Sequence, residues 1–307
     1  MAFTGKQLTT QLDADGTLTV QLNDKTWDDP KPGQVLIKVE ATPINPSDLG
    51  LLFASADTDN AIYSPGKVVA KMPENATRAM KARHGMAMPA GNEAAGIVVA
   101  AGEGCEHLMG KRIACVPGTA YGSYAYADTQ MAFPVDDNVT AEQAASSFVN
   151  PMTALGFVET MKLEGFTGIV HAAAASNLGQ MLVKICQQDG IPLVNVVRSE
   201  EQVKLLKDLG ATHVLNMTDA DYMPKLIDAI AETKAMIGFD PIGGGTVASQ
   251  FLTAMEAAAS RGAAFSRYGS SEAKKVYIYG ALDLGPTILN RAFGLTWDLA
   301  GWLLTPF

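Results

Sequence analysis

The stretch that decides the fold reads Ile169-Val170-His171-Ala172-Ala173-Ala174-Ala175-Ser176-Asn177-Leu178-Gly179. Its apolar beginning predicts a buried strand over 169–171, and the small residues that follow predict a tight turn. Apolar residues at helical spacing then predict a helix over 180–189, and a second apolar run predicts a strand over 193–197. The order strand, turn, helix and strand is typical of a βαβ unit in a parallel sheet.

The turn of small residues indicates a nucleotide-binding site of the Rossmann type. Backbone N–H groups in such a turn can approach a pyrophosphate, and the N-terminus of the following helix favours the same negative charge. The pattern G-x-G-x-x-G falls here on Ala174, Ser176 and Gly179, so only its last glycine is kept. We predict that these three residues, with Asn177 and Leu178, contact the cofactor. An ordinary βαβ crossover with a tight turn remains the alternative.

The end of the second strand indicates which dinucleotide binds. NAD-binding domains carry an acidic residue there for the ribose 2′-hydroxyl, whereas this sequence has Arg198 and Ser199. A cation and a hydroxyl suit a 2′-phosphate, so we predict that the cofactor is NADPH. Tyr279 and Gly280, which end a strand predicted at 276–280, are assigned to the same site.

Composition and charge exclude several classes of protein. The 307 residues are 48% hydrophobic and 18% charged, and the formal net charge of -9 argues against a nucleic-acid-binding surface. Three cysteines lack C-x-x-C spacing, and no run of apolar residues has the length of a signal peptide core or a membrane span. We therefore expect a soluble, cytoplasmic protein that binds neither nucleic acid nor membrane.

The first third of the sequence favours antiparallel β structure. Alternating apolar residues between turn residues predict short strands at 18–22, 35–40, 96–102 and 112–116. The segment 54–85 is long and weakly patterned, as functional or locally structured loops often are. Thr140, an N-cap residue with Gln143 as its capping-box partner, predicts the start of a helix that runs toward Met161.

Strands alternate with helices from 169 onward, which predicts a doubly wound parallel sheet and the fold class α/β. A Gly/Ser-rich connection over 261–275 interrupts this alternation. We place an antiparallel β-domain at 1–145 and a Rossmann domain at 146–296. The apolar end of the chain, from about 297 to 307, is expected to return to the first domain, and its lack of a polar ending suggests a truncated chain.

Four landmarks give the sequence a family resemblance. They are Ile44-Asn45-Pro46-Ser47-Asp48, Pro89-Ala90-Gly91-Asn92-Glu93-Ala94-Ala95-Gly96, Tyr121-Gly122-Ser123-Tyr124-Ala125-Tyr126 and Val149-Asn150-Pro151-Met152-Thr153-Ala154. With these landmarks in this order, the chain resembles the medium-chain dehydrogenase/reductase superfamily over nearly its whole length. The resemblance implies that the first domain is a GroES-like catalytic domain and that the second binds NADPH.

The resemblance also bears on zinc. Zinc-dependent alcohol dehydrogenases of this superfamily carry a Cys ligand in the first landmark and a His ligand in the second. Asn45 and Asn92 stand at these places here, and a carboxamide is a poor zinc ligand compared with thiolate or imidazole. The chain is therefore most similar to the zinc-independent branch, which contains NADPH quinone oxidoreductases and enoyl-thioester reductases, and no metal site is expected.

Three catalytic candidates follow from this resemblance. In the enoyl-thioester reductases the matching asparagine and threonine lie near the nicotinamide, which implies Asn45 and Thr153 here. Each has a structural alternative, because Asn45 could cap a turn and Thr153 could cap helical backbone. Those enzymes also carry a tyrosine about eight residues after the landmark aspartate, where this sequence reads Leu51-Leu52-Phe53-Ala54-Ser55-Ala56. Tyr63 is the nearest phenol and becomes the third candidate, with a surface tyrosine as the alternative.

The sequence thus predicts an NADPH-dependent reductase that transfers hydride to a quinone or an α,β-unsaturated carbonyl compound. A 2-enoyl-thioester reductase is the alternative within enzymes, and an NADPH-binding sensor or structural protein of the same fold is the alternative outside them. The acceptor's identity stays open. We also expect a homodimer, in which an edge strand near 289–297 pairs with its copy and 302–307 pack against the β-domain.

Overall fold

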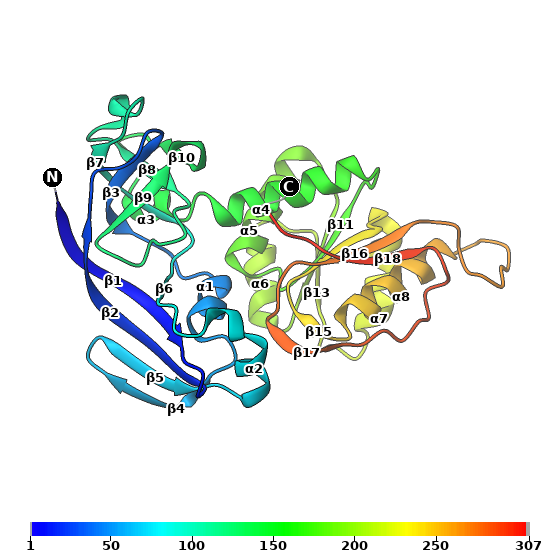
Figure 1. Cartoon of the computed structure of the whole chain (residues 1–307). Helices are drawn as coiled ribbons and strands as arrows, with labels where there is room; N and C mark the ends of the chain where they lie inside the picture. Colours follow the sequence, from blue (N-terminus) through cyan, green and yellow to red (C-terminus); the bar gives the residue numbers. More distant parts are fainter. Residues whose placement is uncertain (1, 305–307) are drawn as a thin grey trace. The chain divides into compact units, whose positions relative to one another are not determined.

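The computed structural model describes residues 2–304, and the chain divides into two compact units, Met1–Val149 and Asn150–Phe307 (Figure 1). The first unit is built on antiparallel sheets and the second on a parallel sheet. The predicted combination of an antiparallel GroES-like domain with a Rossmann domain is therefore confirmed.

Two five-stranded antiparallel sheets make up the first unit. One has the strand order β4-β5-β2-β1-β6 and the other the order β10-β8-β7-β3-β9. Their strands are β1 (Phe3–Leu12), β2 (Thr17–Trp27), β3 (Gln34–Ala41), β4 (Asp57–Ser64), β5 (Lys67–Lys71), β6 (Met88–Pro89), β7 (Ala94–Ala101), β8 (Arg112–Cys115), β9 (Tyr124–Asp128) and β10 (Ala132–Pro134). Alternating apolar residues, such as Leu18 and Val20 in β2, point to the buried face, as the period of two requires.

The weakly patterned segment 54–85 has regular structure of its own. It contains the hairpin of β4 and β5, the helix α2 (Glu74–Ala79) and a short 3-10 helix, η1 (Lys81–Arg83). The hairpin joins the first sheet because β5 pairs with β2. Ala76 and Met80, from α2 and its end, pack with Leu12 and Leu18 beside the end of the helix α1 (Pro46–Phe53).

The second unit is a doubly wound sheet of six parallel strands in the order β13-β12-β11-β14-β16-β18. The strands are β11 (Ile169–Ala172), β12 (Leu193–Val197), β13 (His213–Asn216), β14 (Ile237–Asp240), β16 (Lys274–Ile278) and β18 (Trp297–Gly301), and a separate small pair joins β15 (Gly243–Gly245) and β17 (Asp283–Thr287). The helices are α4 (Val149–Leu163), α5 (Asn177–Asp189), α6 (Glu200–Asp208), α7 (Tyr222–Thr233) and α8 (Val247–Ala259).

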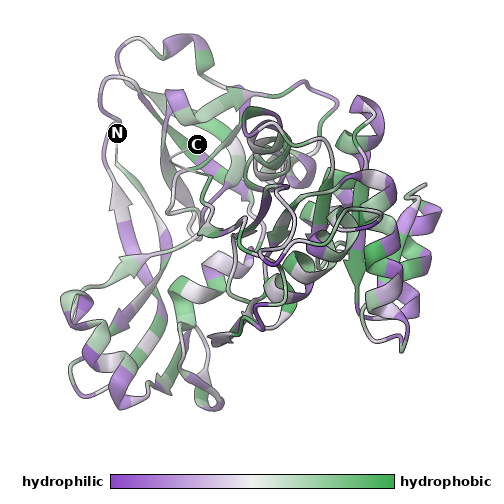
Figure 2. Ribbon diagram, turned by 90° about the vertical axis from the view of Figure 1, so that its right-hand side faces the viewer, coloured by the Kyte–Doolittle hydropathy of each residue, from purple (hydrophilic) through white to green (hydrophobic). Residues whose placement is uncertain are grey.

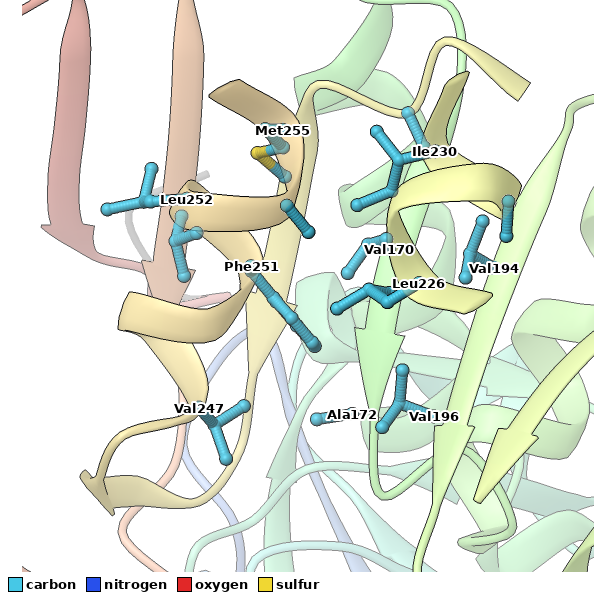
Figure 3. Close-up of a cluster of buried hydrophobic side chains, with 14 of the residues drawn as sticks. Val170, Ala172, Val194, Val196, Leu226, Ile230, Val247, Phe251, Leu252 and Met255 are labelled. Carbon is cyan, nitrogen blue, oxygen red and sulfur yellow. The ribbon is translucent and has the colours of Figure 1, made fainter. Parts of the chain in front are cut away.

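Both faces of this sheet are covered, and every residue of the central strands β11, β12 and β14 is buried (Figure 2). These strands are mainly apolar, and each contains one buried polar residue, His171, Asn195 or Asp240. On one face, Val170 and Val196 pack against α7 and α8 through Leu226 and Phe251 (Figure 3). On the other face, Ile169 and Phe239 belong to a cluster with residues of α4, α5 and α6. The switch in strand order between β11 and β14 opens the carboxyl edge of the sheet for a ligand.

The helix predicted from Thr140 toward Met161 is divided into two helices. Thr140 caps α3 (Ala141–Ala145) with the predicted Gln143, but this helix ends after five residues. The backbone N–H groups of Phe148 and Val149 then donate to Oε2 of Glu93, at 3.3 and 2.7 Å, and α4 begins there. The carboxylate of Glu93, which directly precedes β7, therefore caps the second helix, and local sequence patterns do not reveal this.

The predicted return of the chain to the first domain from residue 297 is wrong for 297–302. Residues Trp297–Gly301 form β18, which pairs in parallel with β16 inside the second unit. The Trp302 ring packs edge-on against Phe157 with centroids 4.8 Å apart, and its Nε1–H donates to Oγ1 of Thr160 at 2.9 Å. Trp297 and Trp302 thus pack within the Rossmann unit, whereas Leu303 stays 65% exposed. Residues 305–307 lie outside the described residues.

The edge strand predicted near 289–297 lies further along the chain, at Trp297–Gly301. Residues 288–296 form no strand, because Asn290 donates its N–H to Oγ of Ser249 and Gly294 has a φ of 65°. Phe293 is fully buried and packs edge-on against Trp297. The edge of the sheet is β18 instead, directly after this irregular segment.

The Glu93→Gln substitution tests the capping of α4. A glutamine has one acceptor oxygen, so either Asn45 or the two backbone N–H groups at the start of α4 lose their acceptor. We expect the free energy of unfolding to fall by about 1–3 kcal/mol, measured by urea denaturation followed by circular dichroism. Glu103→Gln, at an exposed position, serves as the control and should change stability by less than about 0.5 kcal/mol. Equal stability of Glu93→Gln and wild type would contradict this role.

Candidate functional site

The nucleotide turn of the second unit follows β11. Ser176 is the N-cap of α5, and its Oγ accepts the backbone N–H of Gly179 at 3.2 Å. The N–H groups of Asn177 and Leu178, in the same first turn, have no acceptor within the helix. Ala174 ties the turn to β12, because its N–H donates to the carbonyl of Val196 at 3.2 Å. The turn therefore presents helix N-terminal donors beside the switch point of the sheet.

Gly179 is required by the close approach of α5 to this turn. A Cβ at this position would lie 2.2 Å from the carbonyl oxygen of Ala174, which is backbone and cannot move aside easily. The retained glycine of the sequence pattern thus allows close packing of helix against turn, one of the roles glycine has in dinucleotide-binding domains. The positions of the two lost glycines hold Ala174, fully buried, and Ser176, which caps the helix instead.

Arg198 and Ser199 lie at the carboxyl end of β12, the strand next to β11. Ser199 is the N-cap of α6 and accepts the N–H of Gln202 at 3.3 Å. The backbone N–H of Arg198 donates to Oε1 of Gln202, while its exposed guanidinium has no ion-pair partner within residues 2–304. Glu200, the first acid after this strand, accepts a hydrogen bond from Asn216 Nδ2 at 2.8 Å. The structure thus leaves a cation available at this strand end.

Tyr279, predicted to contact the cofactor, is engaged inside the unit. Its hydroxyl hydrogen-bonds Nε2 of His171 at 2.7 Å, and its ring packs edge-on against Phe157 at 4.7 Å between centroids. His171 is completely buried, and burial lowers the pKa of its imidazole to about 3, so the ring is neutral at physiological pH. Gly280 lies close to the loop after β14, since a Cβ at this position would be 2.5 Å from the carbonyl oxygen of Pro241.

Asp240, at the end of β14, was not identified from the sequence. Its side chain is fully buried, Oδ1 accepts the N–H of Ile242 at 2.8 Å, and burial raises the pKa of its carboxyl group. It thereby shapes the loop that contains Gly243 and Gly245, both at positive φ. The sequence pattern that could have pointed to Asp240 is the glycine-rich run Gly243-Gly244-Gly245, which begins three residues after the end of the strand predicted at 235–240.

In the first unit, Asn45 is part of a buried polar cluster. It is the N-cap of α1, so it has the capping role that was given as the structural alternative to a place near the nicotinamide. Its backbone N–H donates to Oδ2 of Asp48 at 2.9 Å, and its Nδ2 donates to Oε1 of Glu93 at 2.9 Å. Asn45, Asp48 and Glu93 are each at most 5% exposed. The cluster therefore fixes the Asn45 carboxamide in one orientation.

Asn92 and Tyr121 extend this cluster. The N–H of Asn92 donates to Oδ1 of Asp48 at 2.8 Å, and its carboxamide donates to Oγ of Ser47. The Tyr121 hydroxyl donates to the carbonyl of Pro43, and burial together with the charge of Asp48 raises the pKa of this phenol. Burial also raises the pKa of Glu93, although the N–H of Val149 and the carboxamide of Asn45 lower it in part. The carboxyl groups of Asp48 and Glu93 thus share one buried, hydrogen-bonded cluster.

Both asparagines at the places of zinc ligands are therefore engaged in hydrogen bonds. Within residues 2–304, no three or more His, Cys, Asp or Glu side chains lie together in a group that could hold a metal ion. No helix in the same part of the chain is long and apolar enough to cross a membrane.

The other two catalytic candidates are Thr153 and Tyr63. Thr153 is buried in α4 and belongs to the second unit, whereas Asn45 belongs to the first. Tyr63 is 65% exposed in the edge strand β4, and its hydroxyl donates to the carbonyl of Thr58 in the same strand. The structure does not bring Tyr63 into the Asn45 cluster. Its strand β4 pairs only with β5, and β5 pairs with β2, so that β4 is the outer strand of a hairpin at the edge of the sheet.

Two family models match the chain. The alcohol dehydrogenase GroES-like domain matches residues 31–137, and the zinc-binding dehydrogenase model matches residues 178–292. The first falls in the first unit and the second in the parallel-sheet unit.

Relatives of known name are similar to both units. A mitochondrial enoyl-[acyl-carrier-protein] reductase from Caenorhabditis elegans is 30% identical over 212 residues, 66% of this chain and 53% of that protein. A quinone oxidoreductase from Salmonella typhimurium is 24% identical over 223 residues, 68% of this chain and 63% of that protein. The chain thus spans between about half and two thirds of the length of these relatives.

Solved structures show the same fold over nearly the whole chain. A structure from Mesorhizobium loti, named as an NADPH:quinone reductase, has a TM-score of 0.72 and 26% identity, covering 99% of this chain and 82% of that one. The Escherichia coli quinone oxidoreductase complexed with NADPH has a TM-score of 0.68 and 18% identity, with coverage of 99% and 82%. With both family models matched in order, the chain belongs to the medium-chain dehydrogenase/reductase superfamily, in its zinc-independent branch of quinone oxidoreductases and enoyl-thioester reductases.

Proposed function

We propose that this protein is an NADPH-dependent, zinc-independent oxidoreductase that reduces a quinone or an α,β-unsaturated carbonyl compound. The observation that carries the proposal is the exposed Arg198 guanidinium at the end of β12, which has no ion-pair partner within residues 2–304. The neighbouring strand β11 leads into the turn before α5, the helix that Ser176 caps. The relatives named as quinone oxidoreductases and enoyl reductases support the reaction class.

The residues of the second unit fit NADPH. The N-terminus of α5 offers free N–H groups for a pyrophosphate, and Gly179 leaves no side chain between the helix and the turn. Arg198 and the Ser199 hydroxyl suit a 2′-phosphate, because guanidinium matches phosphate geometry with paired donors. Glu200 is bonded to Asn216 instead of standing free for a 2′-hydroxyl.

The protein's own contribution to the reaction is orientation and charge. When bound, NADPH supplies a hydride, and a proton completes the reduction of the acceptor. We propose that Asn45, held by Glu93, and Thr153 position the reactants, as the family resemblance implies. Nothing in the surroundings of Tyr63 supports a role as proton donor, so a proton from solvent suffices in this proposal.

The proposal extends to assembly and location. Within residues 2–304 no strand pairs with the outer side of the edge strand β18, which suits pairing with a second copy in a homodimer. The free thiols of Cys105, Cys115 and Cys186 are buried and unpaired as disulfides, which fits a reducing compartment such as the cytoplasm.

Acceptor assays test the reaction itself. NADPH oxidation, followed at 340 nm, is expected with at least one member of a panel of 1,4-benzoquinone, an enone and a 2-enoyl thioester. If NADPH binds and none of these acceptors is reduced, the binding-protein alternative replaces the enzyme.

The Arg198→Glu substitution tests cofactor choice. It removes the cation for the 2′-phosphate and adds a like charge, so NADPH affinity should fall at least tenfold while NADH affinity changes less than threefold. Fluorescence titration of the nicotinamide measures both. Arg267→Glu makes the same charge change at an exposed site in the 261–275 connection and should leave both affinities unchanged. Equal affinity of the wild type for NADPH and NADH would contradict the assignment of Arg198 to the 2′-phosphate.

Light scattering tests the dimer. The wild type should have twice the chain mass of 32.4 kDa. Because the N–H of Trp302 donates to Ile278 in β16, the N–H of Gly301 points to the outer side of β18. Gly301→Pro removes this outer donor and should shift the mass toward a monomer, with an unchanged melting temperature for the remaining fold. A wild-type mass of one chain at every concentration would exclude the dimer.

A further inference from the structure

The first unit has a groove that the proposed function does not use. Its volume is about 600 Å³, which lies within the range of small-molecule sites. Its lining comes from β1 and β2, from the turn between β4 and β5 with the start of β5, and from residues 42 and 121–123. We call it the hairpin groove, and its aliphatic and lysine residues are Leu8, Val20, Leu22, Val68, Lys6 and Lys67.

The hairpin groove is apolar because strand pairing places its aliphatic residues together. Leu8 lies opposite Leu22, and Val20 lies opposite Val68. Leu52 of α1 packs with Val20 in one buried cluster, against which Leu8 and Val68 also pack. Leu22 does not belong to this cluster and stays 49% exposed. The helix therefore covers one part of the apolar face and leaves the part around Leu22 open.

Positive charge borders the hairpin groove. The described residues that line it include Lys6 and Lys67 and no Asp or Glu. Lys67 is exposed and has no ion-pair partner in the part of the chain that the structure describes. Lys6 lies 2.7 Å from Asp24, but both side chains are more than half exposed, so this pair is weak. In a chain whose formal net charge is -9, these two cations favour an anion at this place.

Two hydroxyl groups of the lining are already bonded within the protein. The Tyr121 hydroxyl donates to the carbonyl of Pro43 at 3.0 Å, and Oγ1 of Thr42 donates to the carbonyl of Glu93 at 2.7 Å. These bonds hold the segment just before Asn45. The groove therefore offers an occupant aliphatic surface and ammonium groups, whereas these two hydroxyl donors are taken.

We infer that the hairpin groove binds a single-chain amphipathic anion, with its alkyl chain on Leu22 and its head group at Lys6 and Lys67. Contact between an alkyl chain and an exposed leucine is favourable because it removes both from water. An ammonium group attracts an anionic head as a point charge, so carboxylate and phosphate monoester head groups share this chemistry. Such a ligand needs no group that can accept a hydride, so the inference does not depend on the proposed function.

Calorimetry tests the inference directly. At least one of decanoate and decyl phosphate, each below its micelle concentration, should bind the wild type at one site per chain, and the tighter of the two identifies the head group. Butanoate, which keeps a carboxylate and lacks the long chain, should bind at least tenfold more weakly than this better anion. Decyltrimethylammonium, which keeps the chain and reverses the charge, should also bind at least tenfold more weakly.

The substitution Lys6→Glu/Lys67→Glu reverses the charge of the groove at two exposed positions. It should weaken binding of the better anion at least tenfold and strengthen binding of decyltrimethylammonium, which loss of folding could not produce. The control Lys31→Glu/Lys111→Glu makes the same charge change at two exposed positions of the first unit outside the groove. It should change both affinities less than twofold.

The substitution Leu22→Asn tests the place of the alkyl chain. It replaces aliphatic surface by a carboxamide without changing the charge, so the better anion should bind at least threefold more weakly. Leu163→Asn, at a position that is 78% exposed in the second unit, is the matched control and should leave the affinity unchanged.

Hydrogen exchange and cofactor competition locate the ligand. The better anion should slow amide exchange in residues 64–68 and 121–123, which line the groove or lie between its lining residues. Saturating NADP⁺ should change its affinity less than twofold, because no residue of the nucleotide turn lines the groove.

Each outcome decides the inference. Failure of both anions to bind the wild type overturns it. Equal binding of the better anion and decyltrimethylammonium also overturns it, because the contact would then be an adventitious additive only. Equal binding of the anion to wild type and Lys6→Glu/Lys67→Glu, or loss of binding in saturating NADP⁺, would place the ligand elsewhere and reject the groove. Absence of NADPH oxidation with every acceptor would reject the proposed reaction and leave this binding site intact.

Discussion

The carboxylate of Glu93 is the interaction on which the arrangement of the first unit depends. One oxygen accepts the side chain of Asn45 at the start of α1, and the other accepts the N–H groups of Phe148 and Val149 at the start of α4. Three donors from two segments distant in sequence thus meet one buried anion. A buried charge is tolerated only when its hydrogen bonds are complete, and here they also determine where two helices begin.

The same carboxylate explains why Asn45 stands where related zinc enzymes have a metal ligand. Its carboxamide donates to Glu93 and its backbone donates to Asp48, so the site is closed by hydrogen bonds between residues 45, 48 and 93. An oriented carboxamide of this kind can position a reactant without a metal. This reading is consistent with the proposed hydride transfer, in which the protein orients the reactants and the cofactor carries the chemistry.

The nucleotide turn shows how a Rossmann site survives the loss of two glycines. Gly179 is kept where the helix approaches backbone most closely, whereas Ser176 replaces a glycine at a position where a side chain can cap the helix. Tyr279 shows what the sequence leaves open in the same region. Its place at a strand end predicts contact with the cofactor, and the structure adds a hydrogen bond between its hydroxyl and His171, a residue 108 positions away.

The sequence by itself determined the fold class, the βαβ unit at 169–197 and the cationic strand end at Arg198, because periodicity, turn residues and strand ends are local properties. Only the tertiary structure decided where α4 begins, that Tyr63 lies on an exposed outer hairpin, and that Trp297–Gly301 joins the parallel sheet. These features depend on partners far away in the chain, such as Glu93 for Val149 and Thr160 for Trp302. Hydrogen bonding and apolar burial between distant segments leave no periodic trace in either segment alone, so no local pattern could have predicted them.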